Sequence, residues 1–301
     1  MNLNPKVSLI MPNYNYGSYL KDAIEAVLRQ SYTSFEFIII DDASTDNSLD
    51  IITPYLKKHP FIHLIKHEQN QGMFKSIKDG LKVAQGEYLY VMPSDDLIFP
   101  TFLEKHVRIL DTQPNIGLCC SKYAYFRSDN PSKIYSIDLL KSEKELYLSP
   151  RELIKKIKTK KFWIPGNTAL TRKELFIKYG GLESKYYSNT DWFLLLKIGF
   201  SHGICYLPET LAAMRKHELS YSVTRPITQK YEAWRNMIQF LSISKNKALN
   251  RAFLKSHSFY NFDLEFFNFM LQSPRYLRFF KHHMWTRFFF LWLRKKLKPK
   301  L

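Results

Sequence analysis

In the stretch YVMPSDDLIFP (residues 90–100), an apolar run typical of a strand ends in two adjacent acids, Asp95 and Asp96. Neighbouring carboxylates repel each other, and near a low-dielectric core they usually persist only where a cation or strong hydrogen-bond donors compensate them. The alternative is that they cap the helix expected around residues 100–110, because Asp is a favoured N-cap residue. The residues before this stretch indicate where in a fold the two acids lie.

Four apolar runs alternate with helical patterns in the first hundred residues. The runs are VSLIM (7–11), FEFIII (35–40), FIHLI (61–65) and EYLYVM (87–92). Between them apolar residues recur at helical spacing. Strands that alternate with helices favour a parallel sheet with right-handed crossovers. We therefore expect an α/β fold with a mostly parallel sheet flanked by helices.

Polar residues follow each of these runs. They are Asn13 to Asn15, Asp41 with Asp42, Asn70 to Gly72, and Asp95 with Asp96. In open parallel sheets, ligands bind beyond the carboxyl ends of the strands, so these groups should share one rim. Mg²⁺ favours one or two carboxylates completed by water and substrate phosphates, and a strand-end Asp pair can supply them.

Composition limits the classes of function. The chain has 301 residues, 45% apolar and 24% charged, which is ordinary for a soluble globular protein. Its net charge of +18 predicts attraction to nucleic acid, an anionic membrane surface or phosphorylated substrates. Three cysteines indicate neither a disulfide framework nor a zinc site, and fit a reducing compartment. We expect no export signal and no membrane span, because no apolar run approaches about 18 residues.

Five stretches of the chain follow one another in a characteristic order. They are VSLIMPNYNYGSYL, IIIDDASTDNS, NQGMFKSIKDGLKVAQGEYLYVMPSDD, GNTALTRKELFIKYGGLES and NTDWFLLLKIG. Together they resemble the successive motifs of family 2 glycosyltransferases, over about residues 6–222. The resemblance implies the GT-A fold and transfer of a sugar from a nucleotide diphosphate, with UDP-sugars favoured, with inversion at the anomeric carbon.

The resemblance implies a site for the nucleotide base. The segment Pro12, Asn13 and Tyr14 matches the base cradle, and the flat ring of Tyr14 suits stacking on the base. Asp42 matches the acid that accepts a hydrogen bond from the base, and a carboxylate can accept the imide N–H of uracil. The alternative is that Asp41 and Asp42 only begin an Asx-type turn.

Three cations are implied near the diphosphate and the metal. Lys75 follows Asn-Gln-Gly, where relatives often carry a cation for the diphosphate, although it equally fits a solvated helix residue. In LPETLAAMRKHELSYSV (207–223), Arg215 suits bidentate bracing of the diphosphate. His217 suits the metal shell or a phosphate, although a lone histidine is more often a surface or core residue.

The resemblance also implies a divalent cofactor, Mn²⁺ or Mg²⁺. Asp96 matches the last acid of the DxD-like metal motif, and Asp95 stands beside it, where it assists the metal and contacts the donor. Pro93 stands where a DSDD run has its first Asp. We therefore expect one ion held through Asp96 and Asp95, with a weaker metal dependence than is usual.

Asp191 is the expected general base. It lies in TDWFLLLKIG (190–199), which begins a strongly apolar helix, and it matches the Asp that takes a proton from the acceptor hydroxyl. A helix N-terminus favours an ionised carboxylate, and one within hydrogen-bond reach of a hydroxyl can remove its proton. Thr190 stands where relatives usually have another acid. The alternative is an N-cap residue without chemistry.

The sequence divides into a catalytic domain, residues 1–224, and a helical C-terminal region, residues 225–301. After Glu265 the chain has no acid, and Arg and Lys are interleaved with Phe, Trp and Leu. This pattern favours an interfacial amphipathic helix on an anionic membrane. The alternatives, in order, are a helix that packs on the catalytic body or a partner, and a nucleic-acid-binding segment.

The leading function is thus an inverting glycosyltransferase. It would modify a glycan or lipid-linked acceptor in cell-surface polysaccharide synthesis, in the cytoplasm and peripherally on the membrane, with no nucleic acid as partner. A nucleotidyltransferase would carry a Gly- and Arg-rich phosphate loop after the first strand, where this chain has PNYNYGSY. A non-enzymatic basic module that binds membrane or nucleic acid would not need acids at several strand ends.

Overall fold

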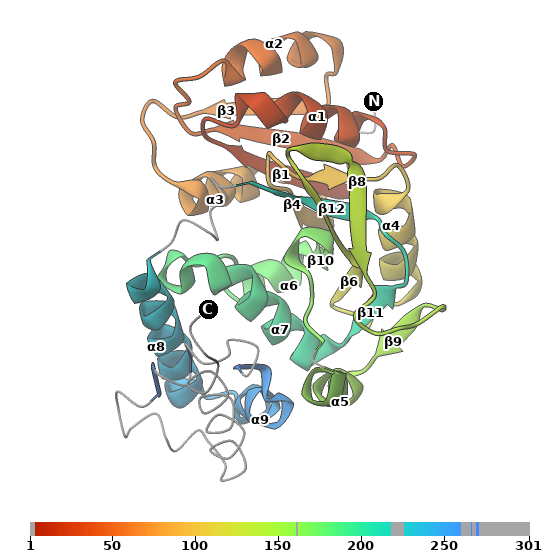
Figure 1. Ribbon diagram of the computed structural model, residues 1–301, viewed down its shortest axis with the longest axis vertical. Coiled ribbons are helices and arrows are strands. Elements are labelled where there is room, and N and C mark those ends of the chain that lie inside the picture. Colours follow the sequence, from red (N-terminus) through yellow and green to blue (C-terminus); the bar gives the residue numbers. More distant parts are fainter. Residues whose placement is uncertain (1–3, 161, 218–225, 260–265, 267–268, 271–301) are drawn as a thin grey trace, which may run out of the picture.

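The computed structural model describes residues 4–160, 162–217, 226–259, 266 and 269–270, and within them a central sheet runs through the molecule (Figure 1). The strand order is β3-β2-β1-β4-β10-β6-β11-β9. These strands are β3 (Ile62–Lys66), β2 (Phe35–Asp41), β1 (Val7–Asn13), β4 (Tyr88–Val91), β10 (Leu170–Arg172), β6 (Leu118–Ser121), β11 (Ile204–Leu207) and β9 (Leu146–Leu148).

The mostly parallel sheet expected from the sequence is confirmed. β1 pairs in parallel with both β2 and β4, and β2 pairs in parallel with β3. β10 is antiparallel to its neighbours β4 and β6, and β9 is antiparallel to β11. β1 and β2 are buried on both faces, which is why their sequences are nearly continuous apolar runs without alternation.

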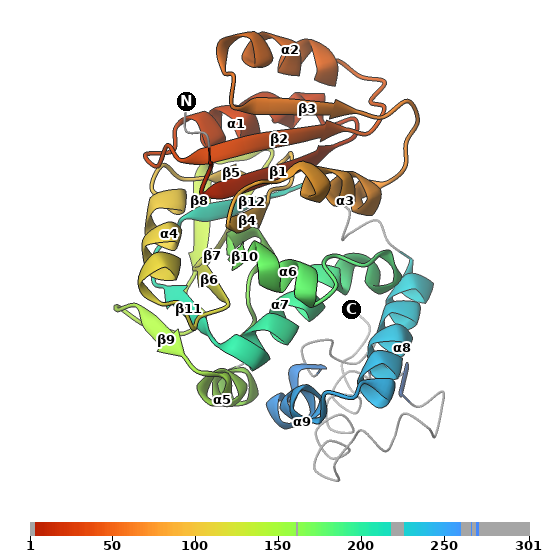
Figure 2. The same cartoon turned by 180° about the vertical axis from the view of Figure 1, so that it is seen from behind.

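Helices cover both faces of the sheet (Figure 2). On one face, α1 (Gly17–Leu28), α2 (Ser48–Lys58) and α4 (Phe102–Thr112) pack in a core with Leu9, Met11 and Ile39. On the other face, α3 (Met73–Val83), α6 (Lys173–Lys178) and α7 (Thr190–His202) pack in a core with Ile10, Ile38 and Ile40. Alternate residues of β1 and β2 thus enter different cores, as the pleat of a strand requires.

A second, four-stranded sheet lies at the carboxyl end of β4. Its order is β5 (Leu97–Ile98), β12 (Ala212–Lys216), β7 (Tyr123–Arg127) and β8 (Asn130–Ile137). β5 begins directly after Asp96 and pairs with β12 in an antiparallel manner. This pairing brings Arg215 of β12, and His217 directly after the strand, to the acid pair. Two 3₁₀ turns, η1 (Gly166–Thr168) and η2 (Ser184–Asn189), precede β10 and α7.

The described part of the chain after residue 225 packs on α7, η2 and α5 (Pro150–Lys160). Figure 1 shows α8 (Ile227–Ile243) and α9 (Lys247–Ser256) beside α7 and α5, at the end of the molecule away from α1 and α2. Trp234 of α8 and Phe253 of α9 belong to the same core as Phe193 of α7. The basic segment after about residue 270, expected to bind membranes, lies outside the described residues. In the described part of the chain, no helix has the length and apolarity to cross a bilayer.

We predict that Phe253→Ala lowers the free energy of unfolding by about 3–5 kcal/mol, the usual cost of truncating a buried Phe. Its side chain is 1% exposed and contacts the rings of Phe193 and Phe200 on α7 at 5.2 and 5.0 Å between centroids. The control is Leu254→Ala at the next residue, which is 45% exposed and should change stability by no more than about 0.5 kcal/mol. Equal effects in urea unfolding would contradict the docking of α9 on α7.

Candidate active site

The residues predicted to bind the base lie at the end of β1. Pro12 and Asn13 end the strand, and Tyr14 follows with 41% of its surface exposed. Asn13 is buried, and its Nδ2 donates to Asp41 Oδ1 at 3.0 Å. Asp41 Oδ2 accepts the backbone N–H of Ser44, three residues on, at 3.1 Å, so Asp41 holds the loop that follows β2. Asn13 Oδ1 is buried and has no hydrogen-bond partner among the described residues.

Asp42 is buried and held by the loop between β3 and α3. Its Oδ1 accepts the backbone N–H of Gln71 at 2.9 Å and lies 2.6 Å from His67 Nδ1. Its Oδ2 accepts the backbone N–H of Gly72 at 2.7 Å. Oδ1 has two polar partners and Oδ2 has one. A further donor would therefore bind at Oδ2, which still has a free lone pair. That Asp42 accepts a base N–H stays a prediction.

Lys75 is joined to Asp42 through two other side chains. His67 Nε2 lies 3.3 Å from Asp79 Oδ2, and Asp79 pairs with Lys75 and Lys82 on the same helix. The hydrogen bonds from the two lysines, that from Lys75 first, lower the pKa of Asp79 to about 2. Lys75 therefore shares one carboxylate on α3 with Lys82, and its role toward a diphosphate stays a prediction. No pattern in the sequence singles out His67 or Asp79.

β12 holds Asp95 and Asp96 in place. The backbone N–H of Arg215 donates to Asp96 Oδ1 at 2.9 Å, and its Nε donates to the backbone carbonyl of Asp95 at 3.0 Å. His217 Nε2 lies 2.8 Å from Asp95 Oδ2. Neither acid caps α4, because that helix begins at Phe102 with Thr101 at its N-cap. The structure thus brings together four of the residues predicted for the metal and the diphosphate.

The guanidinium of Arg215 is buried and already paired. Its Nη2 donates to Asp22 Oδ2 of α1 at 3.0 Å. Its guanidinium carbon lies 4.7 and 4.6 Å from the ring centroids of Tyr19 and Phe126, one on α1 and one on β7. Here Arg215 joins α1, β4 and β7, whereas contact with a diphosphate stays a prediction. Asp22 was missed, since it reads as an ordinary exposed helix acid.

The His217 ring is packed between tyrosines of the first loop and helix. Its centroid lies 5.7 Å from that of Tyr16 and 4.9 Å from that of Tyr19. Its Nδ1 is buried without a hydrogen-bond partner among the described residues. A buried polar atom left unsatisfied is costly, so this nitrogen is a place where a ligand can gain binding energy.

The electrostatics of the acid pair fit a divalent cation. Burial, and then the neighbouring charge of Asp95, raises the pKa of Asp96 well above its ordinary value. A divalent ion would remove this repulsion. In the part of the chain that the structure describes, no three His, Cys, Asp or Glu side chains group closely enough for a metal site. The residues fit an ion of the Mg²⁺ or Mn²⁺ type that takes its other ligands from substrate and water.

Asp191 lies in the first turn of α7 and is not its N-cap, which is Asn189. Burial raises the pKa of Asp191 above its ordinary value. Gly166 of η1 lies directly against this carboxylate, and a Cβ there would overlap Asp191 Oδ2. Thr190, which replaces the usual second acid, accepts the backbone N–H of Glu183 at 2.8 Å. Gly166 was missed, because close approach between distant segments has no local sequence signal.

The turn η1 lies beside Asp191 and the acid pair. Tyr90 of β4 donates its hydroxyl to the backbone carbonyl of Asn167 at 2.7 Å, and the backbone N–H of Ser121 on β6 donates to Thr168 Oγ1 at 3.2 Å. The Asn167 side chain is close enough to Asp96 to lower its pKa. Gly166 meanwhile contacts Asp191. The predicted base Asp191 and the predicted metal ligand Asp96 therefore both lie beside one anchored turn.

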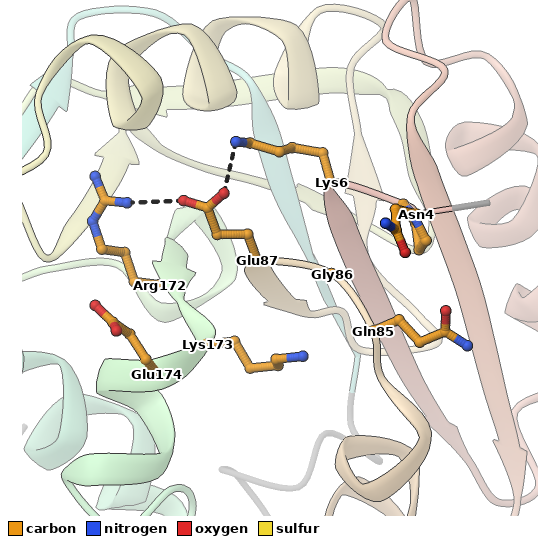
Figure 3. A pocket seen from close by; sticks show the side chains of 9 residues that line it. Asn4, Lys6, Gln85, Gly86, Glu87, Arg172, Lys173 and Glu174 are labelled. Carbon is orange, nitrogen blue, oxygen red and sulfur yellow. Dashed lines mark hydrogen bonds and ion pairs between the residues drawn. The ribbon is translucent and has the colours of Figure 1, made fainter. Parts of the chain in front are cut away.

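A cavity of about 560 Å³ opens at the other end of the strands. Figure 3 shows Glu87 within it, paired with Lys6 at 2.6 Å and with Arg172 at 3.3 Å. Lys6 and Glu87 immediately precede β1 and β4, so this cavity lies at the amino ends of the parallel strands. No residue predicted for the active site lines it.

Comparison with known proteins identifies the family. Residues 8–180, more than half of the chain, match the model of glycosyl transferase family 2. The chain belongs to glycosyl transferase family 2. One curated relative of this family 2 chain is the putative teichuronic acid biosynthesis glycosyltransferase TuaG of Bacillus subtilis, 38% identical over 109 residues, or 36% of this chain and 43% of TuaG. The chain spans somewhat less than half the length of the first curated relatives it matches.

Solved structures share the fold of this family 2 chain. Residues 1–349 of S. aureus TarS in complex with UDP-GlcNAc give a TM-score of 0.65 at 19% identity, covering 95% of this chain and 79% of that one. The mannosyltransferase PcManGT of Pyrobaculum calidifontis, in complex with GDP-Man and Mn²⁺, gives 0.57 at 16% identity, covering 100% and 89%. The GT-A fold expected from the sequence is confirmed.

We predict that Gly166→Ala costs about 1 kcal/mol of stability, the lower end of the range for overpacking, because the atom that must move is the end of a side chain. The new methyl group must displace the Asp191 carboxylate. In an Asp191→Ala background the same change should cost clearly less, with a coupling energy of at least about 0.5 kcal/mol in a double-mutant cycle. Urea unfolding of the four proteins measures this coupling, and strictly additive effects would rule out the contact.

Proposed function

We propose that this chain is an inverting glycosyltransferase that moves a sugar from a nucleotide-diphosphate sugar to an acceptor hydroxyl. The observation that carries this proposal is that Asp191 and Asp96, at distant positions in the sequence, both lie beside the turn η1. A displacement at an anomeric carbon needs a base on one side of the reacting carbon and charge stabilisation at the leaving group on the other. Family membership and the GT-A fold agree with this assignment.

The donor nucleotide would lie over the ends of β1 and β2. The exposed ring of Tyr14 can stack on the base, and the buried, unsatisfied Oδ1 of Asn13 can accept a hydrogen bond. Asp42 fits the imide N–H of uracil through Oδ2. The structural neighbour TarS was solved with UDP-GlcNAc, which supports a UDP-sugar as the first donor to test.

Asp96 and Asp95 would hold Mn²⁺ or Mg²⁺, with His217 beside them. Such an ion, when bound, neutralises charge that develops on the departing diphosphate. The neighbour PcManGT was solved with Mn²⁺ and GDP-Man, which supports a divalent ion in this fold. Lys75 and Arg215 are further candidates for the diphosphate, and each would have to exchange its present carboxylate partner, Asp79 or Asp22, for phosphate oxygens.

Asp191 would activate the acceptor. The acceptor oxygen forms a bond to the anomeric carbon while the bond from that carbon to the diphosphate oxygen breaks, and the hydroxyl proton passes to Asp191. A carboxylate with a raised pKa is a stronger base than an ordinary one, and burial supplies this increase. One displacement inverts the anomeric configuration and forms no covalent sugar–enzyme species.

The acceptor would be a glycan or lipid-linked sugar at the cytoplasmic face of a membrane. The net charge of +18 favours anionic partners, and the name of TuaG places that relative in teichuronic acid biosynthesis. Cell-surface polysaccharide synthesis is therefore the proposed setting, with the basic segment after about residue 270 contacting anionic lipid. Each cation of that segment near the membrane surface contributes about 1 kcal/mol.

We predict that Asp191→Asn lowers the rate of sugar transfer at saturating donor by about 10²–10⁴, the usual contribution of a general base. The amide keeps the shape but not the basicity, so the affinity for the nucleotide should change little. The wild-type rate should fall as the pH falls through the pKa of Asp191, which burial raises, because only the ionised form accepts the proton. The residual activity of Asp191→Asn should not show this fall in rate at low pH.

The assay is release of the nucleotide across a panel of UDP- and GDP-sugars with isolated membrane glycans as acceptors, together with calorimetry of UDP binding. Asp42→Asn is the matched control, since it should weaken UDP binding without removing the base. Transfer by Asp191→Asn at the wild-type rate would show that the base is another residue.

A further inference from the structure

One face of the second sheet is built of tyrosines. β7 reads Tyr123-Ala-Tyr-Phe-Arg127, so alternate residues point to opposite faces. On the inner face, Ala124 and Phe126 pack with Ala213 of β12 and are fully buried. The outer face, which we term the tyrosine face, is only half-buried at its centre and carries Tyr123, Tyr125, Tyr135, Ile137, Met214 and Lys216.

The rings of the tyrosine face form a continuous row that extends to Trp163. Tyr135 of β8 stacks on Tyr125 with 5.0 Å between centroids and 11° between planes. Tyr125 lies 6.1 Å from Tyr123, and Tyr123 lies 5.9 Å from Trp163. Solvent-facing sheet positions normally carry polar residues, so a half-exposed aromatic row marks a binding surface.

The row ends at the candidate active site. Tyr123 lies two residues after Ser121, whose backbone N–H holds Thr168 of η1. Trp163 lies three residues before Gly166, which contacts the Asp191 carboxylate. Burial and then the charge of Asp96 raise the pKa of Tyr123, which agrees with a position near the acid pair. The Tyr123–Trp163 pair is therefore continuous in the chain with η1, the turn that lies beside both Asp191 and Asp96.

Two ammonium groups lie over the far end of the row. Lys216 Nζ lies 3.4 Å from the ring centroid of Tyr125, and Lys133 Nζ lies 5.1 Å from that of Tyr135. Both side chains are exposed. Neither ammonium group has a carboxylate partner among the described residues. Asp129, in the turn between β7 and β8, pairs with Arg127. The tyrosine face therefore presents flat rings at the end near Asp191 and positive charge at the other end.

We propose that the tyrosine face binds an acidic acceptor glycan, whose sugar rings stack on Tyr123 and Trp163. This inference rests on the proposed function, because it places the reacting hydroxyl at Asp191. Tyr and Trp provide large, rigid surfaces with polar tips at a low entropy cost, which suits the apolar face and hydroxyl edge of a sugar ring. Lys133 and Lys216 pair with carboxylate or phosphate groups further along the chain.

The test measures the binding of hexasaccharides by calorimetry and saturation-transfer NMR in the presence of UDP and Mn²⁺. The acidic probes come from polygalacturonate and hyaluronan, and the neutral probes from dextran and amylose. Wild type should bind the acidic probes more tightly. Tyr123→Ala and Trp163→Ala should each weaken binding about tenfold, equivalent to about 1.4 kcal/mol. Lys133→Gln with Lys216→Gln should remove the preference for acidic probes.

Matched variants separate stacking from folding and from general charge. Tyr123→Phe keeps the ring and should bind like wild type. Tyr147→Ala removes an exposed tyrosine of β9, at the edge of the other sheet, and should have no effect. UDP affinity, measured on the same samples, should be unchanged in every variant. A fall in UDP affinity or in melting temperature that parallels the loss of glycan binding would assign the tyrosines a structural role and overturn the proposal.

The outcomes also distinguish this inference from the proposed function. UDP binding without any hexasaccharide binding, or acidic binding that persists in Tyr123→Ala and Trp163→Ala, would overturn the glycan surface while leaving the donor site intact. Glycan binding through the tyrosine face without UDP binding would support the surface and contradict the transferase. Equal binding of neutral and acidic probes would overturn the acidic specificity.

Discussion

The repulsion between Asp95 and Asp96 is the constraint on which the site depends. The two carboxylates follow each other at the end of a buried strand, and Asp96 is almost completely buried. The fold supplies partial compensation from β12, through the backbone N–H of Arg215 and the ring of His217. The pKa of Asp96 nevertheless remains well above its ordinary value. The acid pair is therefore arranged to gain from a cation that comes with the donor.

The same contacts organise the surrounding structure. Arg215 reaches Asp22 of α1 and packs against Tyr19 and Phe126, so β12 joins the first helix to the second sheet. β12 lies beside β7, whose outer face carries the tyrosines. Burying a guanidinium is costly unless it is paired, so this arrangement fixes β12 firmly. The contacts of Arg215 thus connect the acid pair, where the donor is proposed to bind, to β7, which carries the surface proposed for the acceptor.

The first half of the fold was predictable because its signals are local. Each of the first four strands is a short, mostly apolar run, and each is followed by polar residues. The second half was not predicted in detail. β10 has three residues, Leu170 to Arg172, and its antiparallel place between β4 and β6 depends on pairings 50 or more residues apart in sequence. Such short strands carry no periodic signal.

The site shows the same division. Asp42, Asp95, Asp96 and Asp191 were predicted as site residues from their residue type and from their position in the motifs. The residues that contact the site from elsewhere in the chain were not predicted. Asp22 pairs with Arg215, which lies 193 positions away in the sequence, and Gly166 contacts Asp191 only in the folded chain. Alternation in Tyr123 to Arg127 predicts two faces of a strand but does not say which face is buried. That choice is made by Phe126 packing beneath Arg215.

Calorimetric titration of UDP, with Mn²⁺ and with chelator, tests most directly whether the acid pair holds a cation for the donor. If Asp95 and Asp96 do so, chelation should weaken UDP binding by at least about tenfold, or about 1.4 kcal/mol. Asp96→Asn should bind UDP equally weakly in both conditions, since the ligand that anchors the ion is gone. Equal UDP affinity of the wild type with and without chelator, unchanged by Asp96→Asn, would contradict the cation site.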